Sequence, residues 1–159
     1  RRLQEFFYSH TPETIHSRYG YHLTSMTRDR AHELTGTDQD KHLALGVFEM
    51  RGPMQRLHAV GRYYLDDEGD SAEIAFVVRE SKRRFGMGRL LYEALHEIAC
   101  RRGLKKLWAV VARENEPMLR LFKDYGAVLK QRPDESGFHV TINLQAAKQS
   151  PPVKTHLPA

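Results

Sequence analysis

The sequence predicts an α/β (α+β) domain built on a mixed central sheet, and three observations carry that prediction. The unbroken apolar run Ile74–Val78 is rich in β-branched and aromatic residues, which suits a strand covered on both faces. A basic segment with two glycines follows, and apolar residues then recur at helical spacing between Met87 and Ala99. A second apolar run, Leu107–Ala112, comes next. This strand–helix–strand order implies a parallel pair joined by a right-handed crossover.

The segments before this unit predict short helices and then a hairpin. Residues 1–8 have the spacing of a short amphipathic helix, residues 14–21 fit a second short helix or irregular chain, and residues 27–34 fit a further helix. Two strand-like runs, 43–50 and 57–65, are joined by a Gly-Pro turn and read as an antiparallel hairpin. Because a second turn leads into the central strand, three antiparallel strands are expected before the glycines.

The segments after the central helix predict a second helix and two closing strands. Gly103 provides the left-handed residue that ends the long helix. Asn115 is an N-cap for the next helix, which Gly126 ends. The expected closing strands are 128–129 and 138–142, separated by a turn rich in Pro, Asp and Gly.

Length and composition bound the class of protein. The 159 residues, 40% of them hydrophobic, suffice for one domain with a real core, which we place at residues 1–144. Residues 145–159 are Pro-rich without periodicity and predict a tail or linker.

No apolar run approaches the roughly 20 residues of a membrane span. The single Cys100 excludes an internal disulfide and fits a cytoplasmic location. The chain begins with Arg1 rather than Met, which is compatible with a piece of a longer polypeptide.

The glycine segment predicts an anion site. Glycines let backbone N–H groups approach a ligand closely, and the free N–H groups of a helix's first turn favour a phosphate or pyrophosphate. A Walker loop would need Lys-Ser/Thr after its last glycine, but Arg89 and Leu90 follow Gly88. A dinucleotide fingerprint would need a third glycine where Leu91 stands. The spacing is instead R-x-x-G-x-G after a buried strand.

This spacing, from Arg83 to Gly88, resembles the GNAT acetyltransferase superfamily. The resemblance covers residues 1–144 and implies a mixed sheet of about six to seven strands flanked by about four helices. It also implies that the loop binds the pyrophosphate of acetyl-CoA. Two further runs, the one ending at Arg18-Tyr19 and the A-E-I-A-F-V-V of Ala72–Val78, are similar to the bacterial protein lysine acetyltransferases.

Acetyl transfer to an amine needs a held cosubstrate, a polarised carbonyl and an amine that has lost its proton. Removing the proton of a lysine at pH 7 costs roughly 4.6 kcal/mol, and a positioned general base offsets part of that cost. Glu73 is the only carboxylate in the otherwise apolar central strand. It matches the proposed base of the lysine acetyltransferases, so the resemblance implies that Glu73 is the catalytic base.

The expected cosubstrate contacts come from three places. The amide-rich arm should lie in a splay between the two parallel strands and pair with the first strand's backbone, and the N–H of Val78 could polarise the thioester carbonyl. Asn115 matches an asparagine that contacts this arm in the family. The full expected set is Phe76, Val77, Val78, Arg83, Arg84, Phe85, Gly86, Met87, Gly88, Arg89 and Asn115.

The chain departs from the family at one position. Many members have a tyrosine at Phe122 as general acid for the departing thiolate, and this chain has no hydroxyl there. Tyr125 follows on a neighbouring part of the helix face, where core packing and a role as general acid are both open. No metal site is expected, because the histidines are scattered and His96 with Cys100 is an isolated i, i+4 pair.

The sequence therefore predicts an acetyl-CoA-dependent N-acetyltransferase whose acceptor is a protein lysine. A small-molecule amine acetyltransferase and a non-catalytic acyl-CoA-sensing domain fused to a larger polypeptide remain alternatives. The net charge of +5 is compatible with binding nucleic acid. However, the basic residues lack aromatic interleaving and a nucleic-acid motif, so neither nucleic acid nor a membrane is an expected partner.

Overall fold

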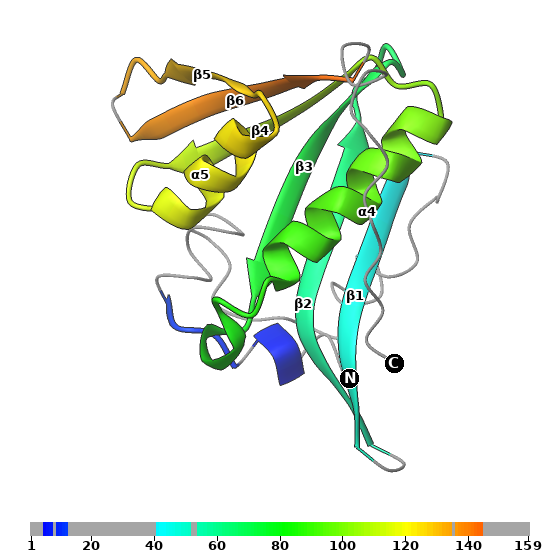
Figure 1. Cartoon of the computed structure of the whole chain (residues 1–159), viewed down its shortest axis with the longest axis vertical. Helices are drawn as coiled ribbons and strands as arrows, with labels where there is room; N and C mark the ends of the chain where they lie inside the picture. Colours follow the sequence, from blue (N-terminus) through cyan, green and yellow to red (C-terminus); the bar gives the residue numbers. More distant parts are fainter. Residues whose placement is uncertain (1–4, 8, 13–40, 52–53, 135, 145–159) are drawn as a thin grey trace.

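The computed structural model describes residues 5–7, 9–12, 41–51, 54–134 and 136–144. They form one six-stranded sheet in the order β1-β2-β3-β4-β6-β5 (Figure 1). All neighbouring strands are antiparallel except β3 and β4, which are parallel. The strands are β1 (His42–Arg51), β2 (Met54–Leu65), β3 (Ser71–Val78), β4 (Lys106–Ala112), β5 (Val128–Gln131) and β6 (Gly137–Asn143).

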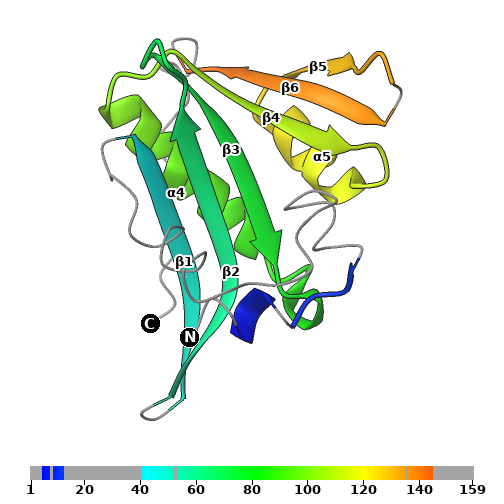
Figure 2. The same cartoon turned by 180° about the vertical axis from the view of Figure 1, so that it is seen from behind.

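Two α-helices cover one face of this sheet. α4 (Met87–Arg101) crosses β1, β2 and β3, whereas α5 (Glu116–Asp124) lies beside β4, as both views show (Figures 1 and 2). The core lies between the helices and the sheet, and it includes Ile74 of β3, Leu95 of α4 and Phe122 of α5. The opposite face of the sheet carries the alternate side chains of each strand, and Glu73 is among them.

The predicted boundaries of the central helix are confirmed. Its N-cap is Gly86, with φ of 77°, and Gly103 just beyond its end also has φ of 77°. This left-handed conformation is strained for any residue with a Cβ, which is why glycine stands at both ends. Leu91 and Leu95 are buried on the sheet side, as the helical spacing predicts.

The second helix also begins where predicted, but its buried stripe differs from the prediction. The Asn115 side chain accepts a hydrogen bond from the Met118 amide at 3.4 Å, which confirms its role as N-cap. The sequence indicates that Met118, Leu121, Phe122 and Tyr125 face the core. The structure buries Leu121 and Phe122 together with Leu119, whereas Met118 and Tyr125 are only partly buried.

The strand predictions are confirmed, with six strands at the lower end of the expected range. The last two strands do not follow chain order in the sheet, because β6 lies between β4 and β5. Besides α4 and α5, the described residues hold a helical turn at 5–7 and a 3-10 turn, η1 (Glu80–Lys82), against about four helices predicted. The predicted segments 14–21, 27–34 and 145–159 lie outside the described residues. No helix within the described ranges is long and apolar enough to cross a membrane.

Candidate active site

The glycine segment folds into a tight turn between β3 and α4. After η1, Arg84 has φ of 68° and Gly86 has φ of 77°. Arg84 is the only residue other than glycine with positive φ in the described part of the chain. The first intrahelical hydrogen bond runs from the Leu90 amide to the Gly86 carbonyl at 3.0 Å, and no side chain caps this end of α4.

The start of α4 is therefore suited to an anion. The amides of Met87, Gly88 and Arg89 precede the first intrahelical donor, so the helix gives them no acceptor. The helix dipole adds partial positive charge at the same place. A Cβ added to Gly86 would meet nothing within 4 Å, so the space beside the turn is open. A phosphate or pyrophosphate fits this arrangement.

The loop also carries exposed basic and aromatic side chains. Arg84 is exposed, and Phe85 is 72% exposed. The Lys82 ammonium lies 5.9 Å from the centre of the Phe85 ring, and the Arg83 guanidinium lies 3.6 Å from a Glu80 carboxylate oxygen. An exposed aromatic ring beside cations can stack on a planar ligand group such as a nucleobase.

Arg89, one of the residues predicted to contact the cosubstrate, has its side chain engaged within the protein. The Arg89 side chain turns towards α5, where it donates to the Asp124 carboxylate at 2.8 Å and lies 5.6 Å from the centre of the Tyr125 ring. These contacts raise the pKa of the Arg89 guanidinium, with the hydrogen bond to Asp124 the largest cause. Its side chain therefore joins α4 to α5, and the backbone amide of Arg89 is the group that could contact an anion at the helix start.

The two parallel strands separate soon after they meet. Their pairing comprises Ser71 with Lys106, Ala72 with Leu107 and Glu73 with Trp108. Beyond that point β3 continues for five residues, 74–78, along β2 alone, and β4 continues along β6 alone. Figures 1 and 2 show the two halves of the sheet fanning apart from this junction.

The separation leaves backbone groups of β3 without a partner strand. The Arg79 amide donates to the His58 carbonyl on β2 at 2.8 Å, so odd-numbered residues of this strand direct their polar groups towards β2. By alternation, Phe76 and Val78 direct their N–H and C=O groups towards the gap. An extended ligand with amide groups can pair there as an added strand would.

Glu73 lies at the junction where the gap begins. Its side chain is partly buried and points to the face of the sheet opposite α4. Among the described residues, none donates a hydrogen bond or forms an ion pair to its carboxylate. No residue in the described part of the chain thus occupies this carboxylate, which could accept a proton or hold a water molecule. It lies about 17 Å along the strand from Val78 at a rise of about 3.3 Å per residue.

An aromatic cluster lies between β3 and the two helices. The Phe76 ring lies 6.5 Å from both Tyr92 and Phe122, and Tyr92 lies 4.6 Å from Tyr125. The Tyr125 hydroxyl donates to Glu93, and burial together with this bond raises the pKa of Tyr125. The Tyr92 hydroxyl is buried and has no hydrogen-bond partner in the described part of the chain.

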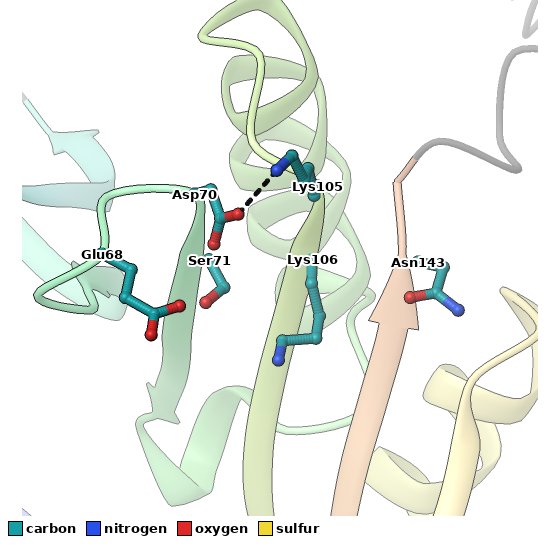
Figure 3. A pocket seen from close by; sticks show the side chains of 6 residues that line it. All are labelled: Glu68, Asp70, Ser71, Lys105, Lys106 and Asn143. Carbon is teal, nitrogen blue, oxygen red and sulfur yellow. Dashed lines mark hydrogen bonds and ion pairs between the residues drawn. The ribbon is translucent and has the colours of Figure 1, made fainter.

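A polar hollow lies at the opposite end of β3 from the glycine turn. Glu68, Asp70, Ser71, Lys105, Lys106 and Asn143 line it (Figure 3). Lys105 donates to Asp70 at 2.9 Å, and this bond lowers the pKa of the Asp70 carboxyl. The mixed charges already neutralise each other, so the hollow lacks the positive excess that a pyrophosphate requires. Within the described ranges, no group of three or more ligand-type side chains could hold a metal ion.

Sequence reasoning missed two neighbours of Glu73. Strand register pairs Tyr64 of β2 and Trp108 of β4 with Glu73 on its two sides. These contacts depend on pairing across three strands, which a single sequence does not reveal. The sequence does show the alternation of inward and outward side chains along each strand. Once the register is known, this alternation assigns Tyr64, Glu73 and Trp108 to one face of the sheet.

A glycine turn at the start of a helix is thus joined by one strand to a carboxylate at a parallel-strand separation. The chain matches the model of the acetyltransferase (GNAT) family over residues 4–127. The chain therefore belongs to this family, whose members use acyl-CoA as cosubstrate.

Solved structures share the fold at low identity. The GNAT domain of S. lividans PAT superposes with a TM-score of 0.75 at 23% identity, covering 89% of this chain and 83% of that one. A domain from Methanocaldococcus jannaschii has a TM-score of 0.68 at 13% identity, covering 89% and 91%. The cAMP-binding acyltransferase from Mycobacterium smegmatis has a TM-score of 0.61 at 24% identity, covering 90% of this chain but 42% of that one.

Proposed function

We propose that this domain transfers an acetyl group from acetyl-CoA to a primary amine, the side chain of a protein lysine, with Glu73 as general base. The observation that carries the proposal is that one strand, β3, has a candidate anion-binding turn at one end and a candidate general base near the other. The anion-binding turn follows β3 directly, and Glu73 stands where β3 and β4 part. One bound acetyl-CoA could contact the turn with its pyrophosphate and present its thioester towards Glu73.

The reaction needs one bond made and one broken. Glu73, directly or through a water molecule, takes a proton from the acceptor ammonium, and the neutral nitrogen attacks the thioester carbon. A C–N bond forms, the C–S bond breaks, and coenzyme A leaves as a thiolate. The developing oxyanion would accept a hydrogen bond from the backbone amide of Phe76, which faces the gap nearer to Glu73 than the amide of Val78 does. Phe122 offers no proton to the leaving thiolate, so the thiolate takes its proton from the nitrogen or from solvent.

The acceptor class rests on the similarity of Ala72–Val78 to lysine acetyltransferases and on the fold shared with a PAT domain. The match to part of a longer cAMP-binding acyltransferase is consistent with a domain that serves a larger chain. A sensing domain would bind acyl-CoA in the same turn but would have no use for a carboxylate at the strand junction that none of the described residues engages. The Glu73 carboxylate, which has no partner within the described ranges, therefore favours catalysis.

The test is Glu73→Gln, which keeps the size of the side chain and removes its basicity. The rate of transfer to a lysine peptide should fall about 10²- to 10⁴-fold, whereas the Kd for acetyl-CoA should stay unchanged. Glu97→Gln is the matched control, because its exposed carboxylate pairs with Arg101 on the same helix. A Glu73→Gln protein with the wild-type rate would refute the role of Glu73. A wild-type protein that binds acetyl-CoA but transfers to no amine would favour the sensing alternative.

A further inference from the structure

The candidate base stands in a row of side chains that crosses the sheet on the face opposite α4. The strand register pairs Glu73 with Tyr64 on one side and with Trp108 on the other. The same row continues to His42 on β1 and Thr141 on β6. Directly opposite residues on antiparallel strands, such as Glu73 and Tyr64, have Cβ atoms about 4.5–5.5 Å apart. Neighbouring strands in general lie about 4.7–4.9 Å apart, so Trp108 on the parallel strand is also an adjacent side chain. The carboxylate of Glu73 is thus flanked by two aromatic residues.

Trp108 is fixed in this row from two directions. Its indole N–H donates to both carboxylate oxygens of Asp66, at 3.2 and 3.0 Å, and Asp66 also accepts from the Ser71 hydroxyl at 2.7 Å. The other support is the His139 ring, which stacks on the indole at a centroid distance of 5.3 Å and an interplanar angle of 13°. Trp108 nevertheless remains partly exposed.

The surroundings of this ring favour a cation. Two carboxylates adjoin the ring: Asp66, which accepts the indole N–H, and Glu73, its partner in the strand register. A rigid aromatic ring beside carboxylates attracts an alkylammonium group through its π face and packs against the attached alkyl chain. A lysine side chain has both parts.

We propose that Trp108 is a specificity-determining wall of the acceptor site, which holds the aliphatic chain and ammonium group of an alkylamine beside Glu73. Asp66 and His139 are positioning residues that keep the indole in place. This inference rests on the proposed transfer to an amine, because it names the residue that selects the acceptor. It adds that neutral or short amines are poor acceptors, since they lack either the charge or the chain that the ring recognises.

The chain offers a direct probe, because Trp108 is its only tryptophan. A short peptide with one central lysine should change the intrinsic fluorescence saturably, and the same peptide with that lysine acetylated should do so much more weakly. This titration needs no acetyl-CoA and no turnover. A peptide that the domain acetylates but that leaves the Trp108 fluorescence unchanged would overturn the proposal.

Kinetics on variants separate recognition from folding. Trp108→Leu should raise the KM for the lysine peptide about threefold to thirtyfold, the range of a cation–π contact, with kcat changed less and the Kd for acetyl-CoA unchanged. Trp108→Phe keeps an aromatic ring but loses the hydrogen bond to Asp66, so its KM should lie between those of the wild type and Trp108→Leu. Val110→Ala, at the 46% exposed position two residues along the same strand face, is the control and should leave KM unchanged.

The outcomes distinguish this inference from the function on which it rests. If calorimetry detects no binding of acetyl-CoA to the wild-type protein, the proposed transfer is refuted, whatever the fluorescence shows. Normal acetyl-CoA binding with an unchanged KM in Trp108→Leu would refute only the acceptor wall. A Trp108→Leu protein that is less thermostable but kinetically normal per folded molecule would show that the indole is purely structural.

Discussion

Replacing Gly86 by alanine should separate the stability of the fold from its affinity for acyl-CoA. Gly86 has φ of 77°, a conformation that costs a residue with a Cβ about 1–2 kcal/mol. A Cβ there would touch no atom within 4 Å, so backbone strain is the whole expected cost to folding. At about 2–4 °C per kcal/mol for a chain of this size, the Tm should fall by about 2–8 °C.

The effect on binding should be larger than this strain implies. The added methyl group would occupy the open space beside the amides at the start of α4, where a pyrophosphate would lie. We expect the Kd for acetyl-CoA to rise at least tenfold, about 1.4 kcal/mol, in isothermal titration calorimetry.

Gly103→Ala is the matched control for this experiment. Gly103 has the same φ of 77° and the same open surroundings, but it lies at the other end of α4. The two variants should lose similar thermal stability, and only Gly86→Ala should lose affinity. Equal acetyl-CoA affinity in Gly86→Ala, Gly103→Ala and the wild type would refute the assignment of the turn as the pyrophosphate site.

Two further predictions concern groups inside the helix layer. Tyr92→Phe removes a buried hydroxyl that lacks a partner among the described residues, so the free energy of unfolding should stay equal or rise by about 1 kcal/mol in urea titrations; a loss of 2 kcal/mol or more would contradict this. Burial raises the pKa of the Cys100 thiol, so alkylation by iodoacetamide at pH 8 should be slower than that of a free cysteine. Because the thiolate is the reactive form, this rate should keep rising above pH 9, and a rate equal to that of free cysteine at pH 8 would contradict the prediction.

Local patterns in the sequence predicted most of the fold. Three of these patterns depend only on residues close together in the chain. They are the apolar run before the glycines, the helical spacing after them and the left-handed glycine that ends the helix. The same holds for Asn115, whose side chain can cap a helix whatever surrounds it. Elements of this kind are confirmed close to their predicted boundaries.

Features that depend on long-range pairing were beyond such reasoning. The position of β6 between β4 and β5 and the aromatic neighbours of Glu73 follow from strand register across the sheet. The side chain of Arg89 turns to Asp124 on another helix, although its sequence context predicts a ligand contact. The positive φ of Arg84 also has no sequence signal, because glycine is the residue usually found in that conformation.

The roles of the predicted site residues stay predictions, and the cosubstrate tests them most directly. The measurement is a calorimetric titration of the domain with acetyl-CoA and, separately, with pantetheine, which lacks the phosphates. The account predicts micromolar binding of acetyl-CoA, at least tenfold weaker binding of pantetheine, and a loss of affinity as salt screens the phosphate contacts. Undetectable binding of acetyl-CoA at low salt, or equal binding of both ligands, would contradict the assignment of the turn and of the reaction built on it.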